Sequence, residues 1–143
     1  MDTKTSANEA ITPETALDVT LDTTKTPAVL DVCEQDNTNH IHKNGSQQII
    51  RWKLTSDASG GTFNSITGDP PGFQWIDTPP AGLFGTPQLI DGGKEITISD
   101  SHYDATTEGE WSYQLNAVIN GNPYSTGPVS IKGDTTDPMI KNK

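Results

Sequence analysis

The segment from Gly109 to Ile131, which reads GEWSYQLNAVINGNPYSTGPVSI, constrains the fold of this chain more than any other. Aromatic and apolar residues occupy every second position over residues 111–119, which is the period of a β-strand with one buried face. Asn120 and Gly121 follow, and both residue types favour tight turns because they tolerate positive φ angles. The pattern predicts a β-hairpin whose return strand carries Tyr124, Val129 and Ile131.

Two further turn signals predict hairpins elsewhere in the chain. An Asn-Gly pair at residues 44–45 precedes Ile50, Trp52 and Leu54 at alternate positions, so Trp52 is expected in the core. The Asp-Gly-Gly run at residues 91–93 separates two more apolar stretches. Thirteen glycines and ten prolines punctuate the 143 residues, and no segment combines helical periodicity with good helix formers, so we predict an all-β fold.

These signals predict about seven to nine short strands in an antiparallel β-sandwich. A small closed β-barrel is the alternative, because strand count and alternation do not separate the two architectures. The sandwich domain is expected over residues 28–133. We expect residues 1–27 to form a flexible acidic N-terminal tail with a possible edge strand at 16–21. We expect residues 134–143 to form a polar C-terminal tail.

Two features resemble the immunoglobulin-like and fibronectin-like sandwiches. The run Gly109–Tyr113 follows an acidic connection and is similar to the corner where a glycine and an aromatic residue begin a late core strand in those domains. Trp52 corresponds to a buried tryptophan of the opposite sheet. The resemblance implies an Ig-like architecture without the cysteine pair of antibody domains, because Cys33 is the single cysteine.

A second likeness concerns the order of the aromatic motifs. In this order the chain is similar to small uncharacterised bacterial β-proteins. The motifs are IIRWKL, GTFN, GFQWI, GLFGTP, EWSYQL and the closing DPMIKN of residues 137–142. That group has no established activity, so the likeness implies a bacterial origin and no functional residue.

Charge and cysteine content narrow the partners and the compartment. The formal net charge of −10 opposes binding to nucleic acids and to anionic membranes, because both carry negative charge. A single cysteine excludes an intrachain disulfide and fits a reducing compartment. The first residues lack the apolar core of a secretory signal, and no stretch is long enough to span a bilayer. We therefore expect a cytoplasmic protein, unless a signal peptide has been removed.

The histidines are the first candidates for a metal site. His40 and His42 are two residues apart, so on a strand both would point to the same side and could bind one Zn²⁺. His102, beside Asp100 and Asp104, would add a third ligand from a distant loop. The simpler interpretation is that these histidines are solvent-exposed, so no metal and no cofactor are favoured.

The acidic segment at residues 100–111 superficially resembles a calcium loop. It has Ala105 and Trp111 where the template requires Gly and Glu, which leaves only an irregular Ca²⁺ site as an alternative. No nucleophile elbow, Cys/His pair or phosphate-binding glycine loop is found in the sequence. We therefore predict that the protein is not an enzyme.

Three aromatic residues, Phe73, Trp75 and Phe84, lie in a Pro/Gly-rich stretch. They either close the open side of the sandwich or form a platform for a sugar ring or a partner's side chain. The first interpretation is favoured because only 31% of the residues are hydrophobic, so the core needs its aromatic rings.

We expect a small non-enzymatic binding module that recognises a protein or a carbohydrate through its loops or an exposed edge strand. A Zn²⁺- or Ca²⁺-binding β-protein and a self-assembling structural subunit are the alternatives. The expected state is a monomer or a weak homo-oligomer.

Overall fold

The computed structural model describes residues 13–126 and 138–143, and within these ranges the chain is all-β, as expected. The strands are β1 (Glu14–Asp22), β2 (Val29–Val32), β3 (His40–Ile41), β4 (Gln48–Leu54), β5 (Thr62–Phe63), β6 (Phe73–Trp75), β7 (Gln88–Ile90), β8 (Glu95–Asp100), β9 (Gly109–Ile119), β10 (Asn122–Ser125) and β11 (Met139–Asn142). Single-turn 3₁₀ helices lie in the connections: η1 (Gln35–Asn37), η2 (Ser56–Ala58), η3 (Asp91–Gly93) and η4 (Ala105–Thr107). In these ranges no helix is long and apolar enough to cross a membrane.

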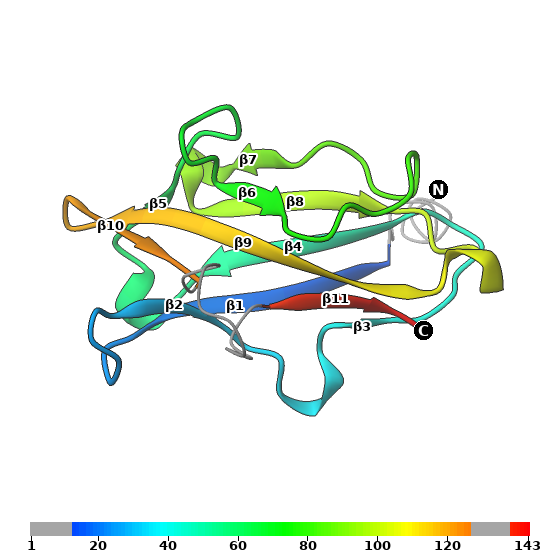
Figure 1. Ribbon diagram of the computed structural model, residues 1–143, viewed down its shortest axis with the longest axis horizontal. Helices are drawn as coiled ribbons and strands as arrows, with labels where there is room; N and C mark the ends of the chain where they lie inside the picture. Colours follow the sequence, from blue (N-terminus) through cyan, green and yellow to red (C-terminus); the bar gives the residue numbers. More distant parts are fainter. Residues whose placement is uncertain (1–12, 127–137) are drawn as a thin grey trace, which may run out of the picture.

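The strands form two sheets, and β9 runs diagonally across the strands of the other sheet in Figure 1. The first sheet has the order β2-β1-β4-β8-β7. The second has the order β10-β9-β11-β3, and β5 and β6 also pair with β9. Two separate sheets account for the described strands, which agrees with the predicted sandwich and overturns the small-barrel alternative.

The sheets are mixed, so the expectation of a purely antiparallel fold with seven to nine strands is wrong. Eleven strands are present in the described ranges. β1 runs parallel to β4, with Leu17 beside Trp52, and β11 runs parallel to β3. Parallel neighbours are joined by long connections, so no local turn signal reveals them.

Two of the three predicted hairpins are confirmed. β9 and β10 are joined by Asn120 and Gly121, which both have positive φ angles of 53° and 79°. β7 and β8 pair across η3, at the predicted Asp-Gly-Gly turn. Two residues of the predicted return strand, Val129 and Ile131, lie outside the described residues.

The hairpin predicted at residues 44–45 is wrong. Asn44 does form a local turn, in which its Oδ1 accepts a hydrogen bond from the backbone N–H of Ser46. The flanking strands nevertheless join different sheets, because β3 pairs with β11 whereas β4 pairs with β1 and β8. A turn signal sets a local bend but does not decide which strand the next segment pairs with.

Both predicted tails contain strands of the sandwich. The possible strand at residues 16–21 is present as β1, but it lies between β2 and β4 rather than at an edge, and its Leu17 and Val19 are buried. β11 pairs with β9 and β3. The backbone of Met139 is held at both polar groups: its N–H donates to Glu34 and its C=O accepts from Asn39. These contacts span about 100 residues of chain, which explains why local reasoning missed them.

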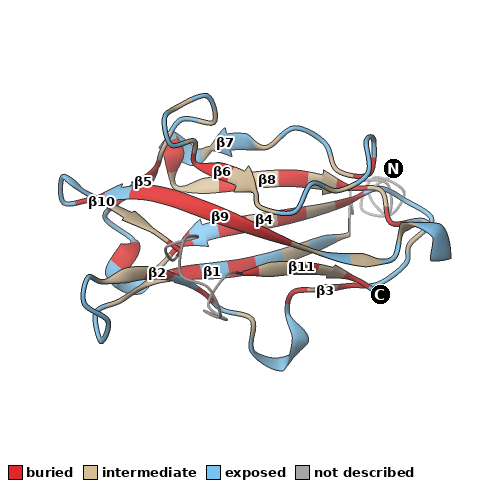
Figure 2. Ribbon diagram, in the orientation of Figure 1, coloured by how far each residue is buried: buried red, intermediate tan, exposed pale blue. Residues whose placement is uncertain are grey.

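The core lies between the sheets, where Figure 2 shows the buried segments of β1, β4, β8 and β9. Trp52 and Tyr113 are fully buried at its centre, and the indole Nε1–H of Trp52 donates to the phenol oxygen of Tyr113 at 2.8 Å. Phe73 stacks on Tyr113 with ring centroids 5.1 Å apart. The expected core role of Trp52 is therefore confirmed, and a hydrogen bond at the centre of the core links the two sheets.

Replacing Tyr113 with Phe should lower the free energy of unfolding by about 1–3 kcal/mol, because it leaves the buried Trp52 N–H without an acceptor. Urea unfolding followed by circular dichroism measures the effect. Tyr103→Phe is the matched control, since the Tyr103 side chain is 49% exposed and its change should stay within about 0.5 kcal/mol. Equal effects of the two substitutions would contradict this description of the core.

Replacing Ile140 with Ala should destabilise the protein by about 2–5 kcal/mol, because the side chain is fully buried. Its neighbour Lys141 points to the other face of β11, so Lys141→Ala should change the free energy of unfolding by less than about 0.5 kcal/mol. The same urea titration compares both variants. An Ile140 variant as mild as the Lys141 variant would show that β11 does not belong to the core.

Candidate ligand-binding groove

A groove opens at the end of the sandwich where β8 ends and β9 begins, with a volume of about 300 Å³. Residues 80–83 form one wall, and Ser101, Tyr103, residues 106–108 and Trp111 form the remainder. We call it the end groove. It brings together two aromatic side chains, several hydroxyl groups and one carboxylate from segments that are up to 31 positions apart in the sequence.

The first wall is held against the end of β8 by backbone hydrogen bonds. The N–H of Gly85 donates to the C=O of Ser99 at 3.0 Å, and the N–H of Ser101 donates to the C=O of Leu83 at 2.9 Å. A Cβ atom at position 85 would come within 2.3 Å of the Ser99 hydroxyl, so glycine here lets the two segments pair without moving that hydroxyl. Leu83 is buried and anchors the wall.

The second wall is the segment from Ser101 to Glu108, which is shaped by its own side chains. The Asp104 carboxylate accepts a hydrogen bond from the backbone N–H of Thr106 at 2.9 Å and so caps η4. The Thr107 hydroxyl donates to the C=O of Asp104 at 2.8 Å. Hydrogen bonds to Thr106 lower the pKa of Asp104, so this carboxylate serves the loop's own structure.

Trp111 is positioned in the groove by a glycine and a phenyl ring. A Cβ atom at Gly109 would lie 2.7 Å from the six-membered ring of the Trp111 indole, so the ring rests directly against the glycine backbone. Phe84 meets Trp111 edge to face, with ring centroids 5.5 Å apart. Trp111 is half-buried and Tyr103 is exposed, so both remain available on the groove surface.

The carboxylate of Glu108 adds an ionised acceptor at the rim. The ammonium group of Lys43 forms an ion pair with it, and the hydrogen bond from Lys43 lowers the pKa of Glu108. Glu108 is exposed, so its oxygens can also accept hydrogen bonds from a ligand.

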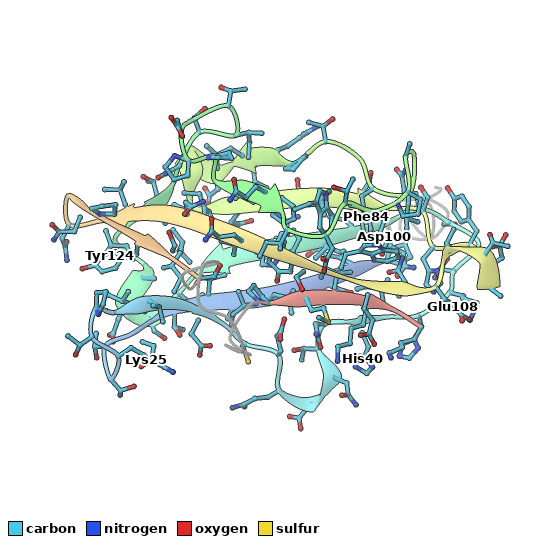
Figure 3. The ribbon with its side chains drawn as sticks, in the orientation of Figure 1. Lys25, His40, Phe84, Asp100, Glu108 and Tyr124 are labelled. Atoms are coloured by element: carbon cyan, nitrogen blue, oxygen red, sulfur yellow. The ribbon has the colours of Figure 1, made fainter. Side chains whose placement is uncertain are left out.

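Two other hollows among the described residues have a different lining. The hollow between β2 and β10 is lined by Tyr124 and by apolar residues such as Pro27 and Val29. The basin beside Cys33 carries the carboxylates Asp18, Asp31 and Glu34 but no aromatic ring. Figure 3 shows Tyr124 at the opposite end of the molecule from Glu108.

Three buried polar side chains, Asp100, His102 and Asn142, lie at the same end of the core beside half-buried Thr107, and we call these four residues the polar layer. The amide Nδ2 of Asn142 donates to Asp100 Oδ1 at 3.2 Å and to the C=O of Thr107 at 3.1 Å. His102 Nδ1 lies 2.7 Å from the Thr107 hydroxyl. Asp100, His102 and Asn142 are each at most 2% exposed. In Figure 3 Asp100 lies near Phe84 at this end.

Burial dominates the electrostatics of the polar layer. It raises the pKa of Asp100 from its ordinary value of 3.8 to about 6, although the hydrogen bond from Asn142 acts in the opposite direction. Asp100 therefore changes charge close to neutral pH while remaining inside the protein.

The aromatic residues predicted to bind ligand occupy the side of the core rather than the groove. Phe73 is 4% exposed and belongs to the core, whereas Trp75 and Phe84 are half-buried and pack against it. Successive ring contacts run from Phe73 to Trp75, Phe84 and Trp111, with centroids 4.8–5.5 Å apart. Only Trp111, at the end of this row, lines the end groove.

The two aromatic residues of the groove, Trp111 and Tyr103, were not among the predicted site residues. Trp111 had been counted as a core position because it shares the alternation of β9. It is the first inward position of that strand, which places it at the mouth of the sandwich. The position of an aromatic residue at a strand end was the available signal.

The structure does not assemble the predicted histidine site. His40 lies on β3, His42 is exposed in the following loop, and His102 is buried in the polar layer. Over residues 13–126 and 138–143, no group of three or more His, Cys, Asp or Glu side chains is placed to hold a metal ion. Desolvation and the nearby Lys143 and Lys141 lower the pKa of His40, so this histidine favours its neutral form.

No protein-family model matches this chain, and no curated protein shows significant sequence similarity to it. The functional argument therefore rests on the geometry of the end groove.

Replacing Asp100 with Asn should stabilise the protein at pH 8 but not at pH 4. Because the folded-state pKa is raised to about 6, the wild type loses stability as pH rises from about 4 to about 6, by about 1–3 kcal/mol in total. The Asn side chain stays neutral, so its advantage appears over that window and persists above it. Urea unfolding of both proteins at pH 4, 6 and 8 measures the difference.

The exposed Asp57 supplies the control for this experiment. Asp57→Asn changes the net charge equally but relieves no buried carboxylate. A pH-dependent gain of the same size in the Asp57 variant would show that general charge repulsion, not the burial of Asp100, is responsible.

Proposed function

We propose that this chain is a small non-enzymatic binding module that takes a neutral carbohydrate in the end groove. The observation that carries the proposal is the placement of Trp111 and Tyr103 beside hydroxyl groups and one ionised carboxylate in a single concave site. This combination matches the two-sided chemistry of a sugar, whose ring carries an apolar C–H face and a polar hydroxyl edge.

Each part of the groove has a role in this proposal. Trp111 and Tyr103 offer aromatic faces on which the apolar side of a sugar ring packs. The Ser101 hydroxyl can donate and the Glu108 carboxylate can accept hydrogen bonds from the hydroxyl groups of the sugar. A volume of about 300 Å³ is at the small end for ligand sites, which favours a short saccharide over a long polymer lying along the surface.

Charge limits the class of sugar further. The chain carries a formal net charge of −10, and Glu108 keeps a negative charge at the rim of the groove. Acidic sugars and phosphorylated sugars would be repelled. A neutral saccharide is therefore the ligand that the groove fits best.

We also propose that the sandwich is of the immunoglobulin-like kind and that the protein works in the cytoplasm. The Ig-like assignment is supported by Trp52 in one sheet facing the aromatic start of β9 in the other. The exposed free thiol of Cys33 supports a reducing compartment.

Isothermal titration calorimetry with glucose, N-acetylglucosamine and their short neutral oligosaccharides tests the proposed function. At least one saccharide should bind, and Trp111→Ala and Tyr103→Ala should each weaken it by about tenfold, as expected for loss of one aromatic contact. Leu89→Ala is the control, because this side chain is exposed on β7, away from the groove, and its loss should leave the affinity unchanged.

Circular dichroism first verifies that each variant is folded. Absence of binding across the whole panel at millimolar concentrations, or equal affinity of the Trp111 and Leu89 variants, would overturn the assignment of the end groove.

A further inference from the structure

Three buried polar atoms of the polar layer have no hydrogen-bond partner in the protein. They are Asp100 Oδ2, His102 Nε2 and Asn142 Oδ1. Buried polar groups are nearly always paired, and an unpaired one carries a substantial free-energy cost. Three such atoms within one connected group of side chains mark a place where the protein itself does not supply every partner.

The hydrogen bonds of the layer identify what these atoms are. The Asn142 amide must point its NH₂ group at Asp100 and Thr107, because both partners are acceptors. The Thr107 hydroxyl gives its proton to the C=O of Asp104, so His102 Nδ1 must be the donor in its contact with Thr107. With Asp100 ionised and His102 neutral, all three unpaired atoms are acceptors.

Protonation of Asp100 relieves part of this cost, because it removes a buried charge. The raised pKa of Asp100, about 6, agrees with a folded state that favours the neutral acid.

The polar layer holds a loop and a strand end rather than the centre of the fold. Asn142 joins β11 to the end of β8 and to Thr107, which itself lines the end groove. The C=O of His102 accepts a hydrogen bond from the N–H of Asn44, so the loop before β4 is attached to the same segment. Loops and strand ends open locally at a lower free-energy cost than the core.

We propose that the polar layer is an acid-dependent latch for the end groove. Neutral Asp100 keeps residues 101–108 and the end of β11 closed on the sandwich, and ionised Asp100 favours their local opening. Any effect of the latch on ligand affinity rests on the proposed function, because it concerns the same groove. The local opening itself does not depend on that function.

Other charged groups surround the latch, and their effects on its pH dependence must be distinguished from that of Asp100. His102 and Asp104 belong to the same segment. Glu108 precedes β9, Glu110 lies on it, and Lys43 and Lys143 form ion pairs with those two glutamates. Gln48, which is opposite Asp100 on β4, and Phe84, which bridges to it from the first wall, are uncharged. The pKa of Asp100 is set by burial and by Asn142.

Hydrogen–deuterium exchange at pH 5 and pH 8, expressed as protection factors, tests the latch. Protection of residues 101–108 and 139–143 should fall about tenfold from pH 5 to pH 8, as expected for a group whose pKa is about 6 when closed and 3.8 when open. The central residues of β4 exchange through global unfolding, which also frees Asp100, so their protection should fall by a similar factor. At both pH values residues 101–108 should nevertheless be much less protected than β4, and equal protection of the two sets would show that no local opening occurs and would overturn the proposal.

Two variants assign the effect to one side chain. Asp100→Asn should abolish the pH-dependent loss of protection, whereas His102→Gln, which keeps a donor for Thr107, should retain it. The opposite result would make His102 the switch and overturn the proposal. A carbon NMR titration of the Asp100 carboxyl in the wild type needs no variant. Its midpoint should lie near the pH at which the protection factors change. A midpoint near pH 4 would also overturn the proposal.

Saccharide titrations at the two pH values separate this inference from the proposed function. Equal saccharide affinity at pH 5 and pH 8, with unchanged protection of residues 101–108, contradicts the latch but supports the proposed function. Absence of saccharide binding at both pH values, with the tenfold change in protection, contradicts the proposed function and supports the latch.

Discussion

The hydrogen bond between Trp52 and Tyr113 is the contact on which the rest of the structure depends. It joins the two largest fully buried side chains, one from each sheet, at the centre of a small core. Phe73 packs against both rings, so the sheets are fixed relative to each other by aromatic contacts and by one satisfied polar pair. In a chain with only 31% hydrophobic residues, this cluster supplies much of the buried apolar surface.

The character of the core changes toward the end where β8 finishes. Along β8 the inward positions are Ile96, Ile98 and then Asp100, so the same face of one strand passes from apolar to ionisable. β11 shows the same change from Ile140 to Asn142. The end groove and the polar layer therefore arise together, because the sandwich ends in polar side chains instead of being closed by apolar ones.

Period-two patterns predicted the strands that carry the core, and the reason is local. β4 and β8 each bury alternate residues, and the turns at residues 91–93 and 120–121 join sequence neighbours. In β9 residues 112–117 are all buried, because other segments also cover the outer face that alternation leaves polar. The parallel pairing of β1 with β4 and the place of β11 depend on contacts across long stretches of chain, which alternation does not encode. The end groove escaped prediction for the same reason, since its walls come from two separate loops that only the folded sheets bring together.

Exchange of the indole N–H protons, followed by two-dimensional NMR, tests the central claim most directly. The account predicts that the Trp52 indole proton, buried and bonded to Tyr113, exchanges with solvent far more slowly than the indole protons of half-buried Trp75 and Trp111. Equal exchange at all three indoles would contradict the presence of a closed contact between the sheets.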